Sequence, residues 1–397
     1  MKVLLATQFF PPVAGGEERH VYNLATALAS RGNEVTVATS SQGSLSGDFE
    51  VVRIEPSASL LRFKYSDSNR PHSLPFSDPI VSRKLKALVL ANRFDVIHGH
   101  NWFANSLLSR SVRGKIPLVQ TLHDYSHVCA TKRLVKYGAL CEGPGLACIS
   151  CSSSHYGDII GPGVAMLNAI ERFKRNARVS HFIAVSRYVA TRNRLSSSGV
   201  PFSVIPNFIP DSLVVETRNE GEDRTIFYAG DLSLDKGVKV LFDAYEILRS
   251  RGLDFELRLA GRRVDVGEIP EGVTYLGELS SIAIEKEINN ATVVAAPSIY
   301  PDPCPTVVLE AMAKGRPVVS TSVGGITDMV ENGISGILTK PDNADATADA
   351  IVKVLLDPVL AKTMGEHALS RVVSFTTSAV VERIEDIYRS AIKNSLN

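Results

Sequence analysis

The stretch YPDPCPTVVLEAMAKGRPVVSTSVGG, residues 300–325, is the strongest indication of the fold in this sequence. An apolar run precedes it at residues 292–296, and another fills residues 317–322. These runs predict two buried strands around a short helix at residues 306–313, which Gly315 ends. Strand, helix and strand in this order predict a βαβ unit of a parallel sheet. Such sheets bind ligands at the carboxyl ends of their strands, where the free N–H groups of a helix start favour an anion.

Two carboxylates flank this predicted helix, with seven residues between them. Asp302 lies in the proline-rich loop, where it can face a ligand. Glu310 lies inside the helix and can accept hydrogen bonds from two neighbouring hydroxyls, as a ribose presents them. The alternative is that both are ordinary solvated acids. The buried strand before them and the glycine pair after them favour a binding site.

The segment resembles the carboxylate-x7-carboxylate motif of retaining family 4 glycosyltransferases, which have the GT-B fold. The resemblance implies that Asp302 contacts the sugar of a nucleotide-sugar donor and that Glu310 contacts its ribose. It also places Cys304, Thr306 and Val307 in the donor site. Both acids are usually glutamate in that family. Asp302 is one methylene shorter, which bears on the identity of the sugar.

The GT-B fold is α/β, with two Rossmann-like doubly wound parallel-sheet domains that face a central cleft. A chain of 397 residues is long enough for two domains. Residues 1–205 are expected to form the N-terminal acceptor-binding domain, with a cysteine-rich insertion at 127–163. Residues 206–375 are expected to bind the nucleotide sugar. The resemblance implies that a last helix, at 376–397, packs back on the first domain.

Charge is distributed unevenly along the chain, although the net charge is only +1. Residues 1–205 carry a net charge of +11 and residues 206–397 a net charge of −10. Either the first half meets an anionic acceptor or a membrane surface, or the two halves attract each other. No nucleic-acid partner is expected. Nothing in the sequence indicates the oligomeric state.

The sequence contains neither a membrane-spanning apolar run nor a signal-peptide pattern, so a cytoplasmic protein is expected. Residues 56–79 are rich in Ser, Pro and Arg and are expected to form a long loop that contributes to acceptor specificity. The helix expected at residues 80–92 carries basic residues around several leucines. It is either a solvated face or a peripheral contact with anionic lipid.

A glycine turn follows the first strand, at Gly15 and Gly16, and leads into a helix. The turn lacks the GxGxxG pattern, so a nicotinamide site is not indicated. The resemblance implies that this turn lies beside the donor phosphates and the acceptor. His20 lies on the following helix and is either a histidine of the acceptor site or one without a binding role.

Histidines also lie at the ends of two predicted strands, at residues 94–102 and 116–125. An imidazole at a strand end can hydrogen-bond a sugar hydroxyl. The resemblance implies that His123 faces the donor sugar. His100, Trp102 and Tyr125 are predicted on the acceptor side.

Four of the five cysteines fall between residues 129 and 151, namely Cys129, Cys141, Cys148 and Cys151. The last two form a CxxC pair, and four thiolates can bind zinc tetrahedrally. The alternative is four reduced thiols on a flexible insertion. A zinc ion here would be structural, because all four of its ligand positions would be filled.

The second half opens with a strand that ends at Gly230 and a helix that starts after Lys236. A lysine beside such a turn is well placed for a diphosphate. The family pattern has an arginine at the position of Asp231, so this acid is a departure. Arg262 or Arg263, at the end of the next strand, is the candidate for the missing positive charge.

The expected reaction is transfer of a sugar from a nucleoside-diphosphate sugar to an acceptor hydroxyl, with retention of anomeric configuration. His123, Lys236 and Asp302 are the candidate catalytic residues, and the chemistry itself is expected to need no metal or other cofactor. A sugar-nucleotide epimerase of GT-B architecture would use the same donor pocket without an acceptor. A non-catalytic protein that binds nucleotide sugars is the third alternative.

Overall fold

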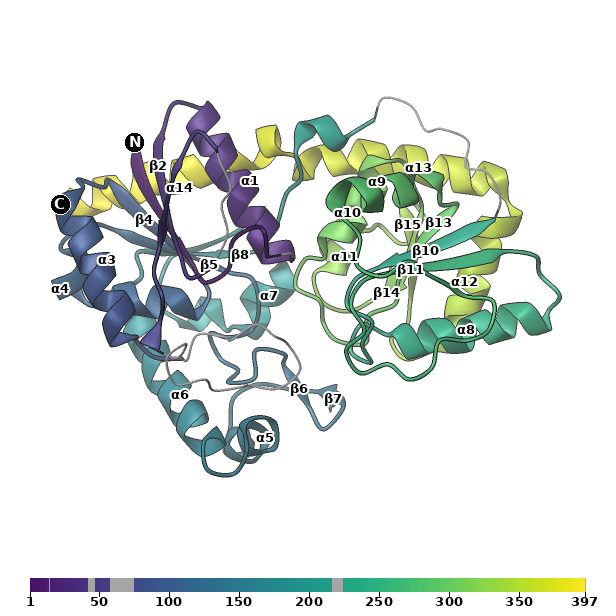
Figure 1. The fold of residues 1–397 in the computed structure, drawn as a ribbon, viewed down its shortest axis with the longest axis horizontal. Coiled ribbons are helices and arrows are strands. Elements are labelled where there is room, and N and C mark those ends of the chain that lie inside the picture. Colours follow the sequence, from purple (N-terminus) through teal and green to yellow (C-terminus); the bar gives the residue numbers. More distant parts are fainter. Residues whose placement is uncertain (14, 42–46, 58–74, 216–223, 397) are drawn as a thin grey trace. The chain divides into compact units, whose positions relative to one another are not determined.

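The computed structural model describes residues 1–13, 15–41, 47–57, 75–215 and 224–396 (Figure 1). These residues divide into two compact units. Unit 1 is Met1–Asn207 together with Thr377–Asn397, and unit 2 is Phe208–Thr376. Most of the loop expected at 56–79, with its basic residues Arg62, Lys64 and Arg70, lies outside the described residues.

Unit 1 contains a seven-stranded parallel sheet with the order β3-β2-β1-β4-β5-β8-β9 in its described part. The central strands are buried along almost their whole length, as expected for a parallel sheet that helices cover on both faces. The strands are β1 (Lys2–Thr7), β2 (Glu34–Thr39), β3 (Glu50–Arg53), β4 (Val96–His100), β5 (Leu118–Leu122), β8 (His181–Ala184) and β9 (Phe202–Val204).

Local sequence explains where the helices of unit 1 begin. Asp78 caps the helix α3 by accepting hydrogen bonds from the backbone N–H groups of Ile80 and Val81, at 2.9 and 3.0 Å. The helix α6 begins at Gly161, directly before a proline, which is tolerated in a first helical turn. The helices are α1 (Gly16–Ser30), α3 (Pro79–Ala91), α4 (Arg110–Arg113), α5 (Ala147–Tyr156), α6 (Gly161–Arg178), α7 (Arg187–Arg192) and α14 (Thr377–Leu396), with 3-10 turns η1 (Trp102–Leu107) and η2 (Leu195–Ser197).

The last helix, α14, belongs to unit 1 although it follows unit 2 in the sequence. It lies beside α1 and packs on β4 and β5 (Figure 1). The Tyr388 hydroxyl is 2.6 Å from Nδ1 of His98, and both side chains are fully buried. Glu385 of the same helix accepts hydrogen bonds from Arg31 and Asn33. The C-terminal residues therefore complete the core of unit 1.

Unit 2 contains a six-stranded parallel sheet with the order β12-β11-β10-β13-β14-β15 in its described part. Helices α8 and α12 pack together on one face, and α9, α10 and α13 lie over the other (Figure 1). The strands are β10 (Thr225–Ala229), β11 (Glu256–Ala260), β12 (Thr274–Tyr275), β13 (Val293–Ala296), β14 (Val318–Thr321) and β15 (Gly336–Thr339). The helices are α8 (Val238–Ser250), α9 (Ser281–Asn290), α10 (Thr306–Ala313), α11 (Ile326–Met329), α12 (Ala344–Leu356) and α13 (Pro358–Val372), with 3-10 turns η3 (Asp211–Leu213) and η4 (Val373–Phe375).

The cysteine-rich insertion is ordered. It contains a small antiparallel pair, β6 (Val135–Lys136) and β7 (Ala139–Leu140), followed by α5. Helix α5 packs against α6, which anchors the insertion to unit 1. Among the described residues, no helix is both long enough and apolar enough to span a bilayer.

Candidate functional site

The centre of the candidate site in unit 2 is an ion pair between Lys236 and Asp302. Lys236 lies just before α8, and Asp302 lies in the loop between β13 and α10. Asp302 is only 6% exposed, whereas a third of the Lys236 side chain meets solvent. The Lys236 ammonium also lies 5.8 Å from the centre of the Tyr300 ring. The lysine is thus held at a defined position with part of its surface open to a ligand.

Two glycines fix the backbone around this pair. Gly237 has φ +72°, and a Cβ there would lie 1.8 Å from the carbonyl oxygen of Pro297. Gly324 has φ +71°, and a Cβ there would lie 2.4 Å from the carbonyl oxygen of Asp302. The neighbouring N–H of Gly325 donates a hydrogen bond to that same carbonyl, at 2.7 Å. No other residue type fits at these two positions without moving the loops that carry Lys236 and Asp302.

Helix α10 begins directly after the Asp302 loop, and its first turn has no side-chain cap. Thr306 and Val307 are partly exposed there, so the helix start offers backbone N–H groups and the positive end of its dipole. Glu310 is partly exposed one turn later, on the face of Thr306. Cys304, by contrast, is buried with its sulfur 3.8 Å from that of Met329. Its side chain is a core group, and only its backbone is suited to contact a ligand.

The structure accounts for the acid at the position of the family arginine. Asp231 forms an ion pair with Arg262, with 2.9 Å between Nη2 and Oδ2. The loops that follow β10 and β11 are in close contact, because a Cβ at Gly261 would lie 1.8 Å from the carbonyl oxygen of Gly230. Arg263 donates to the carbonyl of Gly267 instead. Arg262 therefore balances the charge of Asp231. Both residues were expected in the donor site, and the structure brings them together.

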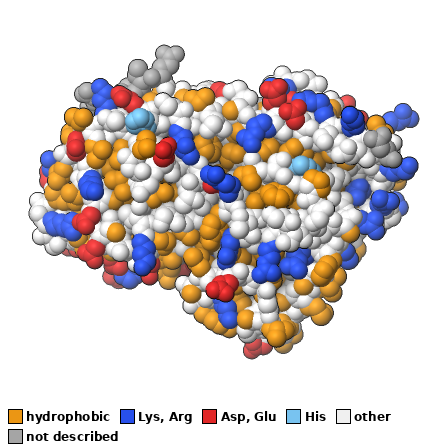
Figure 2. Space-filling model, turned by 180° about the vertical axis from the view of Figure 1, so that it is seen from behind, with side chains coloured by type: hydrophobic (Ala, Val, Ile, Leu, Met, Phe, Trp, Pro, Cys, Tyr) orange, Lys and Arg blue, Asp and Glu red, His pale blue; other side chains and the backbone are white. Residues whose placement is uncertain are grey.

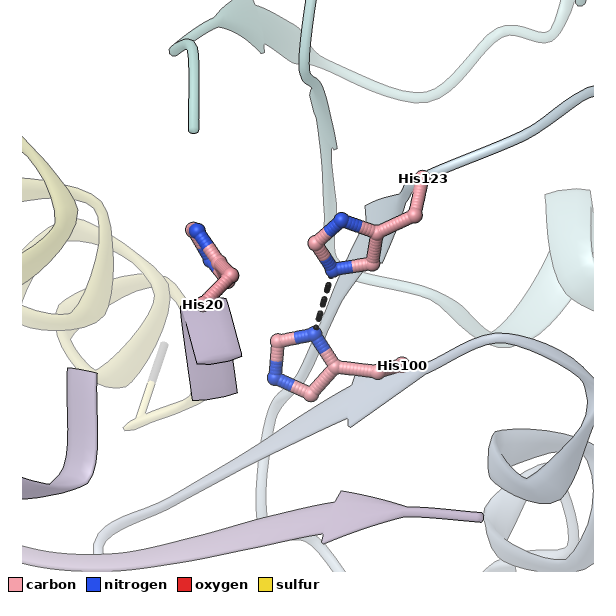
Figure 3. A group of neighbouring side chains, drawn as sticks. All are labelled: His20, His100 and His123. Atoms are coloured by element: carbon pink, nitrogen blue, oxygen red, sulfur yellow. Dashed lines mark hydrogen bonds between the residues drawn. The ribbon is translucent and has the colours of Figure 1, made fainter. Parts of the chain in front are cut away.

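In unit 1 the predicted histidines form one cluster at the carboxyl ends of β4 and β5 (Figure 3). Nδ1 of His100 is 2.9 Å from Nε2 of His123, and the two rings are stacked 5.2 Å apart. His20, from α1, has its ring centre 4.9 Å from that of His123. His98 lies behind His100 and is hydrogen-bonded to Thr121 as well as to Tyr388.

These imidazoles are held in the neutral form. Burial lowers the pKa of His20 to about 3, and burial followed by the charge of His20 lowers that of His98 to about 3. Burial also holds the pKa of His100 and of His123 well below the usual range, and the neighbouring histidines add to the effect. Neutral imidazoles can donate one hydrogen bond and accept another, as a sugar hydroxyl requires.

Ligand nitrogens of His20, His100 and His123 lie within 4.8 Å of one another, the one such group of metal-binding side chains in the part of the chain that the structure describes. A metal ion there would displace the existing hydrogen bond between His100 and His123. The geometry accommodates a hydrogen-bonding role without any rearrangement.

The sequence alone did not point to an acidic group near this cluster. Glu17 accepts hydrogen bonds from Asn101 and from the Thr7 hydroxyl. Burial raises the pKa of Glu17 to about 8, and the charges of Glu18 and Asp124 add to this, whereas Lys132 opposes it. Glu17 directly follows the Gly15-Gly16 turn, so an acid next to that turn was the available signal. No such signal in the sequence pointed to Lys132, because it lies within the cysteine-rich insertion.

Lys132 connects the insertion to the predicted acceptor residues. Its ammonium lies over the Trp102 ring, 4.3 Å from the ring centre. Trp102 is 2% exposed and donates from Nε1 to the carbonyl of Ser126. Tyr125 is fully buried and packs edge-on against Tyr188, 6.1 Å away. Both aromatic residues are buried, and Tyr125 in particular is a core residue in this structure.

All four cysteines of the insertion line one small cavity. Burial raises the pKa of the Cys151 thiol, and the charges of Cys129, Cys141 and Cys148 raise it further. The fifth cysteine, Cys304, lies in the core of unit 2.

Comparison with known proteins identifies the family of this chain. The model of glycosyl transferases group 1 matches residues 212–371, and that of Glycosyltransferase Family 4 matches residues 14–213. A glycogen synthase from Mycobacterium tuberculosis is 24% identical, with 98% of this chain and 95% of the relative covered. A phosphatidyl-myo-inositol mannosyltransferase from Mycolicibacterium smegmatis is 26% identical, with 98% and 94% covered.

Among solved structures, Anabaena HepE in complex with UDP-glucose has a TM-score of 0.70 and 19% identity, with 98% of this chain and 100% of that chain covered. The two parallel-sheet α/β units thus have the GT-B fold, as predicted from the sequence. The two family models together span both units from residue 14 to residue 371. The chain is a glycosyltransferase that belongs to Glycosyltransferase Family 4, with the group 1 glycosyl transferase module in its second half.

Proposed function

We propose that this glycosyltransferase moves a sugar from a nucleoside-diphosphate sugar to an acceptor hydroxyl and retains the anomeric configuration. The observation that carries the proposal is the Lys236–Asp302 pair beside the uncapped start of α10. A cation and free N–H groups at one place suit the diphosphate of a donor. The same groups stabilise the negative charge that grows on the leaving phosphate.

Each group at this site has a distinct role in the proposal. Lys236 and the backbone N–H groups of Thr306 and Val307 hold the two phosphates. Glu310, one turn along α10, accepts hydrogen bonds from the ribose hydroxyls. Asp302 holds Lys236 in place and accepts a hydrogen bond from the sugar. UDP-glucose is the first donor to test, since a protein of the same fold was solved with it.

The reaction proceeds in one step on one face of the sugar. The bond from C1 to the phosphate oxygen breaks, and the bond from C1 to the acceptor oxygen forms on the same face. The acceptor proton passes to the leaving phosphate, and the products are the glycoside and the nucleoside diphosphate. Lys236 and the amides of α10 supply the charge stabilisation that a divalent cation gives elsewhere. Added Mg²⁺ or Mn²⁺ is therefore expected to change the rate less than about twofold.

The acceptor is expected at unit 1, beside the histidine cluster. Neutral His20, His100 and His123 can hydrogen-bond hydroxyl groups of the acceptor. Lys132, together with the net charge of +11 on residues 1–205, favours an acceptor that carries a phosphate or carboxylate.

A peripheral membrane contact is proposed for the surface of α5 and α6. Helix α3, the helix for which this contact was expected from the sequence, buries Leu85 within unit 1 and exposes one large apolar side chain, Leu90. On α5, α6 and the segments beside them, hydrophobic side chains gather at the surface, as the lower part of Figure 2 illustrates. Leu146 and Ile159 are 92% and 95% exposed, and Phe173 is 66% exposed among basic residues of α6. Apolar and basic side chains together suit a surface of anionic lipid.

Sedimentation with anionic and with neutral vesicles tests this contact. Binding to anionic vesicles that is lost in Leu146→Asp/Ile159→Asp, but kept in Leu356→Asp of unit 2, is the expected result. Equal sedimentation of the double variant and the wild type would rule this surface out.

Incubation of the protein with donor and an acceptor panel, followed by NMR of the product, tests the proposed reaction. The expected product is a glycoside whose anomeric coupling matches that of the donor. An inverted product would disprove retention. Epimerised donor formed without any acceptor would favour the epimerase. Tight UDP-sugar binding with no turnover across the panel would favour a binding protein.

A further inference from the structure

The four cysteines of the insertion come together from three separate places in the chain. Cys129 follows β5, Cys141 follows the β6–β7 pair, and Cys148 and Cys151 lie one turn apart on α5. All four line the same cavity, whose volume is about 30 Å³. That volume suits a single water molecule or ion and leaves no room for an organic ligand.

The insertion buries few apolar side chains, too few to account for this convergence. Among its described residues the buried ones are Val128, Ala130 and Leu134. The small cluster around Ala130 is completed by Val164 and Ala165 of α6. Other apolar side chains of the insertion are largely exposed. The exposed fractions are 49% for Leu140, 92% for Leu146 and 50% for Ile149. Segments with so little buried apolar surface are usually held by cross-links or metal ions.

The backbone between the first two cysteines also needs a restraint. Lys132, Leu134 and Tyr137 have positive φ values of 64°, 56° and 49°. Residues other than glycine rarely adopt this conformation, so something around them must hold it.

We propose that Cys129, Cys141, Cys148 and Cys151 bind one zinc ion tetrahedrally and thereby fold the insertion. The CxxC pair on α5 presents two sulfurs on one helix face, and the two loop cysteines complete the set. The site binds a metal without an open position, so it is structural and takes no part in the transfer chemistry.

The thiols now have weaker partners that a metal would replace. Sγ of Cys148 accepts from the N–H of Gly145 at 3.3 Å, a contact that also suits a zinc-bound thiolate. Sγ of Cys129 is 3.3 Å from the Thr131 hydroxyl, and Sγ of Cys141 is 3.5 Å from the carbonyl of Gly143. The four sulfurs are spaced more widely than in a ligated site, and side-chain rotation has to close them to about 2.3 Å from the ion.

The zinc ion would also fix Lys132 at the histidine site. The N–H of Cys129 donates to the carbonyl of Tyr125 at 2.8 Å, and the N–H of Lys132 donates to the carbonyl of Cys129 at 3.2 Å. The N–H of Tyr125 donates in turn to the carbonyl of Lys132 at 3.3 Å. A metal ligand in the middle of this short loop therefore holds both Lys132, which lies over Trp102, and Tyr125.

Metal analysis of the full-length protein tests the proposal without any assay of transfer. The protein is expressed with added zinc, purified under reducing conditions without chelators, and analysed by plasma mass spectrometry. About one zinc ion per chain is expected in the wild type. The Cys148→Ser/Cys151→Ser variant should lose it, and Cys304→Ala, which alters the cysteine in unit 2, should keep it.

Spectroscopy of the unaltered chain covers the case in which the double variant fails to fold. Replacement of zinc by Co²⁺ should give sulfur-to-cobalt charge-transfer bands and the intense visible bands of a tetrahedral site. Wild-type protein without zinc and with four rapidly titrating thiols, or with disulfides, would overturn the proposal. So would zinc that persists in the cysteine variant and is lost in His123→Asn.

The effect on the acceptor site is a separate readout that rests on the proposed function. Removal of zinc is expected to raise the acceptor KM about tenfold or more, since a small displacement of a binding loop has effects of this size. The Kd for UDP, which unit 2 binds, should not change. An unchanged acceptor KM in metal-free protein would disprove the positioning of Lys132, whatever the metal content shows.

Discussion

The two units share one architecture but use their strand ends differently. In unit 1, buried and neutral groups gather there, with His98, His100 and His123 at β4 and β5. Residues 208–376 contain one histidine, the exposed His367, and unit 2 presents a fixed cation, Lys236, instead. The difference indicates that unit 1 is built to exchange hydrogen bonds with hydroxyl groups. Unit 2 is built to hold a negative charge.

Removal of the fixed cation is expected to have the largest effect. Lys236→Ala should lower kcat/KM by about a hundredfold to a thousandfold, because the leaving phosphate loses its charge partner. Lys239→Ala is the matched control, since that lysine lies on the first turn of α8 and pairs only with exposed Asp243. Initial rates of nucleotide release measure both. A loss of less than about threefold in Lys236→Ala would contradict the role given to unit 2.

The backbone of the Asp302 loop provides the second test. In Gly324→Ala, the new Cβ would lie 2.4 Å from the carbonyl oxygen of Asp302, so the loop must move and donor binding should weaken strongly. Gly333→Ala is the control, because it has a similar φ of +79° and nothing within 4 Å of the new Cβ. The control should cost only about 1–2 kcal/mol of unfolding free energy and leave the Kd for UDP unchanged. Equal Kd values for the two variants would show that the loop position is unimportant.

Low pH is expected to destabilise unit 1 more than unit 2. The pKa values of His20 and His98 are lowered by burial from 6.5 to about 3 in the folded chain. The unfolded chain therefore binds more protons below about pH 6.5, and stability is lost as the pH falls from there toward 3. The single tryptophan, Trp102, lies in unit 1, so its fluorescence reports on that unit. Glu17, whose pKa is raised to about 8, opposes this trend, but it is one carboxyl against several buried imidazoles. The midpoint of the thermal transition of Trp102 fluorescence should therefore fall between pH 7 and pH 5, by more than the midpoint of circular dichroism, which reports on the whole chain. A midpoint that is constant over this range would contradict the buried neutral cluster.

The buried contact of α14 gives the smallest expected effect. Tyr388→Phe leaves Nδ1 of His98 buried without its 2.6 Å partner, at a cost of about 1–3 kcal/mol. Tyr245→Phe removes a comparable hydrogen bond, to the carbonyl of Glu271, within unit 2. Urea unfolding followed by Trp102 fluorescence should respond to the first substitution and not to the second. The opposite pattern would contradict the assignment of α14 to unit 1.

The parts of the fold that depend on local pattern were predictable from the sequence. The helix at 306–313 has the predicted bounds, and the strands on either side of it lie within one residue of theirs, because apolar runs and a terminating glycine define them. The return of the last helix to unit 1 was expected only from the family resemblance. Its partner in the core, His98, is separated from Tyr388 by 290 positions, and no local pattern encodes such a contact.

The candidate site was predicted in part, for the same reason. Lys236, Asp302 and His123 could be singled out because each follows a strand or opens a helix. The pairing of Asp231 with Arg262 and that of Glu17 with Asn101 depend on how separate loops meet. Lys132 reaches Trp102 through a loop with positive φ values at non-glycine residues, a conformation that composition does not reveal.

Hydrogen–deuterium exchange with and without UDP shows which unit holds the nucleotide. We expect slower exchange in two segments of unit 2, residues 230–241 and 300–312. The histidine-bearing strand ends of unit 1 should remain unchanged. Lys236→Ala should abolish the slowing at the same UDP concentration. Protection confined to unit 1, or protection of unit 2 that survives in Lys236→Ala, would contradict the account.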